Sequence, residues 1–150
     1  MTSDGTPWRP LVHVEDICGA IACVLNAPRE AVHTEVLNVG DTAANYQVKD
    51  IAEIVARTFP GCRLSFGTRD GDNRSYRVSF DKIRRLLPEF RCRHDAAAGA
   101  AQLRRIFERV GLAADRFEFR AFTRLKQLEY LLRTGQIDAD CFWSDEATGR

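Results

Sequence analysis

The residues best suited to bind a ligand are arginines in turn-rich segments beside predicted strands. Arg9 lies in the segment 4–16, and Arg69 and Arg74 lie in the segment 68–83. A guanidinium group presents a planar fork of donors that pairs with phosphate oxygens, and loops carry much of the binding function of proteins. The sequence therefore predicts a local anion site, with Arg9 and Arg69 as its main residues. Arg74 is a third candidate that could instead pair with a neighbouring aspartate.

The composition limits what this site can be. Of the 22 lysines and arginines, 19 are arginine, so a solvated side chain or a surface ion pair is the simpler interpretation of any one of them. The formal net charge is only +1, which excludes a whole-chain field that would draw the protein to nucleic acid or to a membrane surface. The basic stretch 82–93 has no run of aromatic residues, so RNA binding is not expected.

No other pattern in the 150 residues predicts a catalytic residue, a metal centre or a bound cofactor. The histidines His13, His33 and His94 are far apart in the sequence, without the spacing of a metal motif. There is no G-x-S-x-G elbow, no glycine-rich phosphate turn, and no tyrosine followed four residues later by a lysine. The five cysteines are odd in number and scattered, so free thiols in a reducing compartment are expected.

Hydrophobic periodicity predicts short strands separated by amphipathic helices. Asp16 is expected to cap the first helix, and His13 to pack and hydrogen-bond in the strand before it. Strands are expected at residues 10–14, 34–39, 63–66 and 75–80, and helices from Asp16 to just before Pro28, over 48–59, 81–87 and 95–110, and from about Phe122 to Gly135. The apolar residues expected to face inward from the first, third long and last helices are Ile17, Ala20, Ile21, Val24, Leu25, Leu103, Ile106, Phe107, Val110, Phe122, Leu125, Leu128, Leu131 and Leu132.

This order of elements predicts an α/β fold of short strands with packed helices. Strands and helices do not alternate in a complete run of βαβ units, so a complete dinucleotide-binding domain is not expected. The length of 150 residues fits one domain. We expect it to span residues 1–143, with residues 144–150 as a frayed tail.

Five short motifs in order resemble the C-terminal part of the NAD(P)-dependent nucleotide-sugar epimerase/dehydratase family, the extended short-chain dehydrogenases. The segment 4–16 is similar to the D-G-T-x-x-R-(D/P)-x-V-H-V-x-D stretch of that family, and the helix after it follows the D-(I/V)-x-x-A pattern. Further similar motifs are Leu37-Asn-Val-Gly40, Arg69-Asp-Gly-Asp72 and the segment 76–87. The resemblance extends over residues 3–143.

The resemblance implies a role for two of the arginines. In the family, the residues that match Arg9 and Arg69 reach the diphosphate of a nucleotide sugar. Full members also carry a G-x-x-G-x-x-G turn, a catalytic Ser or Thr and a Y-x-x-x-K pair, and none of these is present in this sequence. The resemblance thus implies the substrate-binding portion of an extended Rossmann-type epimerase. We expect a truncated form that needs NAD(P) only as part of the complete enzyme and is inactive alone.

The alternative is a non-catalytic module that binds a nucleotide sugar or another anion, or that docks onto a partner. The strand expected at 34–39 would be an edge strand of the main sheet in the family, and such a strand and its apolar face would be exposed here. A separate nucleotide-binding half or a homo-oligomer would cover them. No apolar run approaches the ~18 residues of a membrane span, and no signal peptide is evident. A cytoplasmic location is expected.

Overall fold

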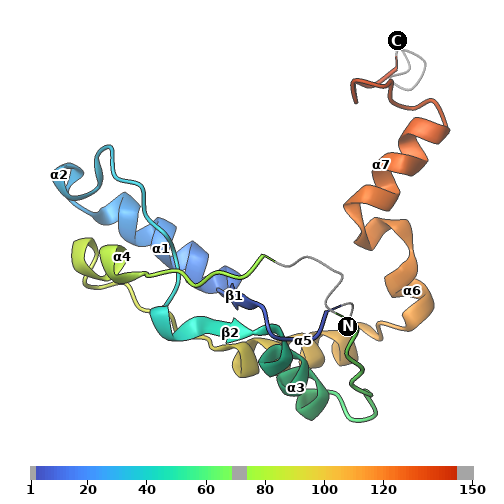
Figure 1. Ribbon diagram of the computed structural model, residues 1–150. Helices are drawn as coiled ribbons and strands as arrows, with labels where there is room; N and C mark the ends of the chain where they lie inside the picture. Colours follow the sequence, from blue (N-terminus) through green and yellow to red (C-terminus); the bar gives the residue numbers. More distant parts are fainter. Residues whose placement is uncertain (1–2, 69–73, 145–150) are drawn as a thin grey trace. The chain divides into compact units, whose positions relative to one another are not determined.

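The computed structural model describes residues 3–68 and 74–144 (Figure 1). The chain divides into two compact units, Met1–Ile106 and Phe107–Arg150. The described residues form many helices and one small sheet of two strands. The predicted α/β class is therefore confirmed. Most of the tail expected at 144–150 lies outside the described residues. The single domain expected over residues 1–143 stays a prediction.

A short antiparallel ribbon organises the first unit. Strand β1 (Trp8–Pro10) pairs with β2 (Asn45–Gln47), and Arg9 lies opposite Tyr46. Backbone hydrogen bonds extend the pairing beyond both ends, from Leu11 N to Ala44 O at 3.0 Å and from Val48 N to Pro7 O at 3.0 Å. A two-stranded ribbon is only marginally stable by itself, so it depends on the segments and helices packed against it.

The segment 74–80 lies along this ribbon without forming a strand. Its backbone bonds mainly to side chains: the amide group of Asn45 accepts from Val78 N and donates to Val78 O, each at 2.9 Å, and the Thr42 hydroxyl accepts from Phe80 N at 3.1 Å. One backbone bond joins Tyr76 N to Trp8 O at 3.3 Å. The strand predicted at 75–80 is therefore wrong, because side chains take the place of a partner strand.

Helices account for most of the remaining structure. In the first unit, α1 and α4 lie side by side, and α3 packs near β2 (Figure 1). The helices begin and end as follows: α1 Val14–Asn26, α2 Arg29–Val32, η1 Thr42–Ala44, α3 Val48–Thr58, α4 Asp81–Leu86, α5 Ala96–Val110, α6 Ala114–Glu118, η2 Arg120–Phe122 and α7 Arg124–Arg133. The predicted helices agree with α1, α3, α4, α5 and α7 to within a few residues. By contrast, α2, η1, α6 and β2 were not predicted, and β1 overlaps the strand predicted at 10–14 only at Pro10.

The core of the first unit is small and lies between α1 and α4. Ile83 is its most buried residue, with 1% of its surface exposed. Around it pack Ala20 from α1 and the rings of Phe80 and Phe90. Gly40 is needed beside this core because its φ is +156° and a Cβ there would lie 2.6 Å from a ring carbon of Phe80. Only glycine leaves room for that ring.

Three more of the predicted strands do not form as predicted. No strand of the described structure lies beside residues 34–39 or 63–66 to complete a ladder, and of residues 10–14 only Pro10 belongs to a strand. Pro10 ends β1, and α1 already begins at Val14. In the segment 34–39, Leu37 and Val39 pack against the core as extended chain, while Val36 is exposed.

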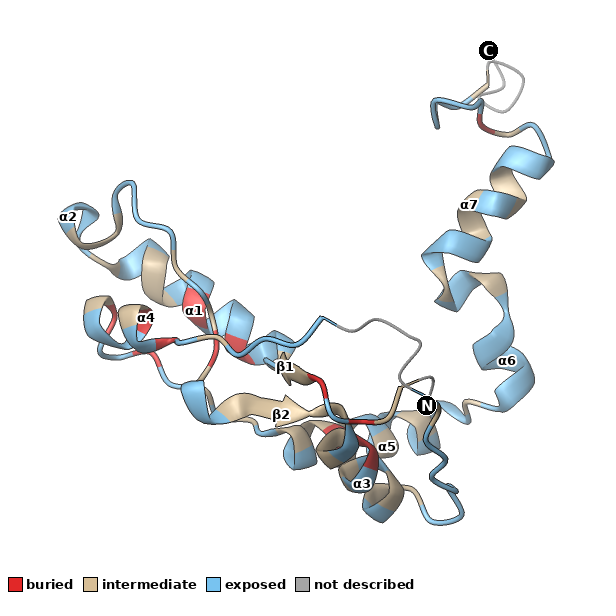
Figure 2. Cartoon of the chain, in the orientation of Figure 1, coloured by how far each residue is buried: buried red, intermediate tan, exposed pale blue. Residues whose placement is uncertain are grey.

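The predicted burial of the helix faces is wrong over much of their length (Figure 2). On α1, Ala20 and Val24 pack into the core, but Ile21 and Leu25 are 55% and 80% exposed. Successive residues of a helix are about 100° apart, so the side of α1 that contacts α4 turns these two outward. Leu103 on α5 and Leu125 on α7 are likewise exposed. The remaining residues predicted to be inward but exposed are Ile17, Ile106, Val110, Phe122 and Leu132.

The second unit is stabilised by a few local contacts. The guanidinium of Arg120 lies over the rings of Phe119 and Tyr130, at 4.8 and 3.8 Å from their centroids. Ile137 is buried and forms an isolated antiparallel bridge with Trp143. Within the described ranges of both units, no helix combines the length and the apolar character needed to cross a bilayer.

We predict that Ile83→Ala lowers the free energy of unfolding by about 2–5 kcal/mol, because it leaves a cavity in the centre of a small core. Urea denaturation followed by circular dichroism measures this loss. Val36→Ala is the control, since Val36 is 82% exposed, and its effect should stay within about 0.5 kcal/mol. Equal losses in the two variants would contradict the assignment of the core.

Candidate functional site

Arg9 is held by its surroundings at the edge of the ribbon. Its Nη1 donates to the carbonyl of Trp8 at 2.8 Å and to the carbonyl of Arg74. The guanidinium also lies over the Tyr76 ring, 5.3 Å from the centroid. These contacts join β1 to the segment that follows residue 73, and they restrict the orientations available to the half-buried Arg9 side chain.

A second arginine and a second ring extend this surface. The guanidinium of Arg77 lies 4.9 Å from the centre of the Trp8 ring, and the Ser75 hydroxyl accepts a hydrogen bond from Trp8 N at 3.1 Å. We call Trp8, Arg9, Arg74, Tyr76 and Arg77 the arginine–aromatic patch. Guanidinium groups beside aromatic faces suit ligands that combine an anionic group with a planar ring.

The structure describes two of the three predicted anion ligands and brings them close together. Arg9 and Arg74 come together, since the Arg74 carbonyl accepts from Arg9 and the Arg74 side chain is exposed. Arg69 lies outside the described residues. Arg77 was not predicted as an anion ligand. Its position shortly after the predicted anion loop, next to Tyr76, could have indicated it. The roles of Arg9, Arg69 and Arg74 as diphosphate ligands stay predictions.

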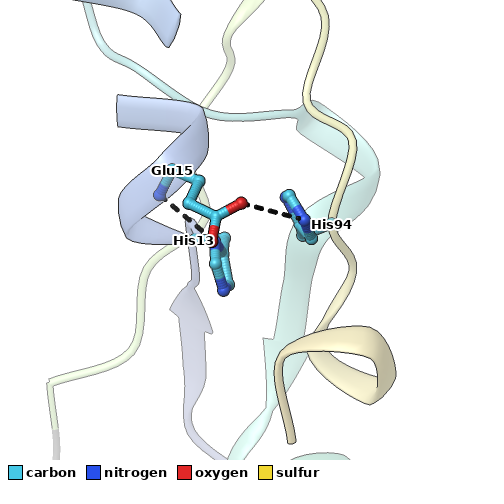
Figure 3. Close-up of side chains that lie close together, drawn as sticks. All are labelled: His13, Glu15 and His94. Atoms are coloured by element: carbon cyan, nitrogen blue, oxygen red, sulfur yellow. Dashed lines mark hydrogen bonds and ion pairs between the residues drawn. The ribbon is translucent and has the colours of Figure 1, made fainter. Parts of the chain in front are cut away.

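A second group of polar side chains forms where α1 begins. The rings of His13 and His94 stack with centroids 4.1 Å apart and planes tilted by 24° (Figure 3). His13 is the N-cap of α1, because its Nδ1 accepts from Glu15 N at 3.2 Å. The predictions that Asp16 caps this helix and that His13 belongs to a strand are therefore wrong. The two histidines are far apart in the sequence, but the fold brings their rings together.

Asp16 is buried in the first turn of α1 and anchors the chain before α5. Its carboxylate accepts from Arg93 N at 2.9 Å, from His94 N at 3.1 Å and from the His94 ring, whose Nδ1 is 3.2 Å away. Burial by itself would raise the pKa of Asp16, but these donors outweigh it and the pKa is lowered. The group is therefore a charged, buried carboxylate that holds residues 93–94 against α1.

Glu15 and Gln102 complete a network around the two histidines. The Gln102 amide donates to a Glu15 carboxylate oxygen at 2.8 Å, and its oxygen is 2.5 Å from His13 Nε2. The other oxygen of Glu15 lies 3.5 Å from His94 Nε2. We call His13, Glu15 and His94 the histidine–glutamate cluster. Nothing in the sequence pairs its distant members, so sequence reasoning missed it.

The five cysteines are free, as expected from their number and spacing. Cys18, Cys62 and Cys141 are exposed, while Cys23 and Cys92 are half-buried. Burial, together with the nearby carboxylates of Asp16 and Asp41, raises the pKa of the Cys92 thiol. This thiol is accordingly a poor nucleophile.

The fold and these contacts define a mixed α/β protein with an arginine-bearing surface beside its only described sheet. Residues 1–40, which include β1, α1 and Arg9, match the model of the NAD dependent epimerase/dehydratase family. The predicted resemblance is thus confirmed over this N-terminal part of the chain, while the match does not extend to the motifs after residue 40. No curated protein matches the chain. The family implies NAD(P) and nucleotide-sugar substrates for its full-length members.

The residues present do not fit the dinucleotide that the family uses. A dinucleotide site of the Rossmann type needs a parallel strand, a glycine-rich turn and the N-terminus of the following helix. The sheet of the described residues is antiparallel, with two strands, and the sequence has no G-x-x-G-x-x-G turn. No step through NAD(P) can therefore be derived from this chain.

We predict that Asp16→Ala lowers the free energy of unfolding by about 3 kcal/mol, because it leaves the buried N–H groups of Arg93 and His94 without an acceptor. Asp16→Asn should lose about half as much, since one carbonyl oxygen remains. Urea denaturation measures both, with the exposed Glu30→Gln as the control. A loss below about 0.5 kcal/mol for Asp16→Ala would contradict the anchoring role.

Proposed function

We propose that this chain is the substrate-binding portion of an NAD(P)-dependent nucleotide-sugar epimerase/dehydratase, equivalent to the C-terminal part of that family. In this proposal Arg9, Arg69 and Arg74 hold the diphosphate of the substrate. The observation that supports it best is the restrained position of Arg9 within the segment 1–40 that matches the family.

The chemistry of a diphosphate explains why a restrained arginine is useful. Its oxygens carry negative charge and accept charge-assisted hydrogen bonds, which are about twice as strong as neutral ones. A guanidinium already oriented by the Trp8 carbonyl and the Tyr76 ring loses less conformational entropy when it binds. Binding energy from such a remote group positions the reacting sugar in the complete enzyme.

The aromatic members of the patch fit the rest of the substrate. Tyr76 is 51% exposed, so part of its ring is open to a base or a sugar. Trp8 is half-buried and carries Arg77 on its ring. The Trp8 and Tyr76 rings thus offer stacking surfaces next to the guanidinium groups of the patch. A ligand with a nucleoside and a diphosphate requires both kinds of group.

We propose that this chain binds the nucleotide sugar but does not catalyse the reaction alone. Proton transfer at the sugar in the family depends on a tyrosine whose pKa is lowered by a lysine four residues later. Tyr46, Tyr76 and Tyr130 are followed at that spacing by Asp50, Phe80 and Thr134. The missing groups would come from a nucleotide-binding half.

The α1 helix favours a docking role as the second candidate. Val14, Ile17, Ile21 and Leu25 follow helical spacing along one side of α1, and their exposed fractions are 65%, 36%, 55% and 80%. A contiguous apolar stripe on a protein surface usually marks an interaction site. We propose that the nucleotide-binding half of the enzyme covers this stripe, and that a second copy of the chain covers it when that half is absent.

We predict that UDP- or dTDP-sugars release or absorb heat on titration into the chain. Arg9→Ala should weaken binding by about tenfold or more, because a charge-assisted hydrogen bond contributes ~1.5–3 kcal/mol. The double variant Arg9→Ala/Arg69→Ala should abolish detectable binding, and the exposed Arg29→Ala is the control. Isothermal titration calorimetry makes the measurement. No heat with any nucleotide sugar, or equal affinities for Arg9→Ala and Arg29→Ala, would overturn the binding proposal.

We also predict that the purified chain self-associates through the α1 stripe. Sedimentation velocity should show oligomers whose share falls in the double variant Ile21→Gln/Leu25→Gln, because polar side chains remove the gain from apolar burial. Leu125→Gln is the matched control, since Leu125 is an exposed leucine on α7. A monodisperse, cooperatively melting monomer at high concentration would argue against the docking role.

A further inference from the structure

We propose that the histidine–glutamate cluster binds a divalent transition-metal ion of the zinc class. Its three potential donor atoms come from two separate segments and lie within 4.8 Å of one another. Two imidazoles and one carboxylate are a donor set that zinc and similar ions prefer. This proposal is independent of the arginine–aromatic patch.

The hydrogen bonds of His94 supply the first argument. Asp16 is a charged acceptor 3.2 Å from His94 Nδ1, so in the neutral ring the proton belongs on Nδ1 and a lone pair remains on Nε2. A histidine that binds a metal through one ring nitrogen usually donates the N–H of the other nitrogen to a carboxylate, which fixes the orientation of the ring. The buried position of Asp16 keeps this orientation fixed.

The position of Glu15 supplies the second argument. Its Oε2 lies 3.5 Å from His94 Nε2 (Figure 3), so a lone pair of the neutral ring faces a carboxylate oxygen. Two acceptors so placed attract a cation between them. The Glu15 side chain is 59% exposed, which lets it move toward an ion without disturbing the core.

His13 provides the third donor at the expense of one hydrogen bond. Its Nδ1 accepts from the backbone of Glu15, and its Nε2 faces the Gln102 oxygen at 2.5 Å. Donors that share a zinc ion at ~2.1 Å are about 3.4 Å apart. The cluster therefore has to close by up to about 1.4 Å. Because Nε2 carries the ring proton that faces Gln102, the ion would bind Nδ1 and displace the bond from Glu15 N.

A proton on His94 Nε2 is the competing cation, because an imidazolium would also satisfy both carboxylates. The chain contains its own control for telling the two apart. It has three histidines, and His33 is exposed and outside the cluster. A site-specific readout of the three rings therefore separates a metal site from general binding to histidines or to the free cysteines.

The test is a titration of the chain with Zn²⁺, followed by the ring resonances of the histidines in proton–carbon NMR spectra. We expect the resonances of His13 and His94 to shift together and to saturate at one equivalent, while those of His33 stay in place. Unshifted His13 and His94 resonances at excess Zn²⁺, or equal shifts of all three rings, would overturn the proposal and leave the proton as the cation of the cluster.

Variants locate the ion. Glu15→Gln and His94→Gln should each weaken Zn²⁺ binding at the histidine rings by tenfold or more, whereas His33→Gln should bind as the unmodified chain does. Since His94→Gln also removes a partner of the buried Asp16, Glu15→Gln is the decisive variant, and circular dichroism confirms that it is folded. Unchanged affinity in Glu15→Gln would overturn the assignment of Glu15 as a ligand.

Discussion

The structure of the first unit depends on one buried charge. Asp16 is the only buried polar or charged side chain among the described residues, and it accepts from the backbone of Arg93 and His94. A carboxylate removed from water is costly unless donors surround it. Here the donors belong to the segment that precedes α5, so satisfying the charge also holds this segment against α1. The stacking of His94 on His13 follows from the same anchor.

The apolar core of the first unit is small for the amount of apolar sequence present. Ile83, Ala20 and the nearby phenylalanines fill it, yet Ile21 and Leu25 remain exposed on the outer side of α1. A helix that is apolar on more than one side is typically covered on more than one side. The proposed docking onto a nucleotide-binding half would supply the missing cover and, with it, the groups needed for turnover.

Helices could be predicted from the sequence more reliably than strands, for a physical reason. The helix α3 follows from local spacing and from Pro60, which stands just beyond its end. A strand exists only when a distant segment lies beside it, and the sequence does not say which one. The side-chain amide of Asn45 makes the hydrogen bonds to the Val78 backbone that a neighbouring strand would otherwise make. No pattern of apolar residues predicts this contact.

The candidate sites divide in the same way. Arg9 could be identified because its motif is local and recognisable, but its stacking on Tyr76 depends on how the segment 74–80 returns to the ribbon. His13 and His94 could not be paired from the sequence, because their contact results from the burial of Asp16. Sequence patterns thus indicate single residues that bind, whereas groups assembled from distant segments require the fold.

The central claim is that the Arg9 guanidinium contacts the diphosphate of a nucleotide sugar. NMR spectra of the arginine Nε–H groups, recorded with and without UDP-glucose or a dTDP-sugar, test it directly. The account predicts that the Arg9 signal shifts and becomes protected from exchange with water, while the signal of the exposed Arg124 does not change. An Arg9 signal that is unaffected by saturating nucleotide sugar would contradict it.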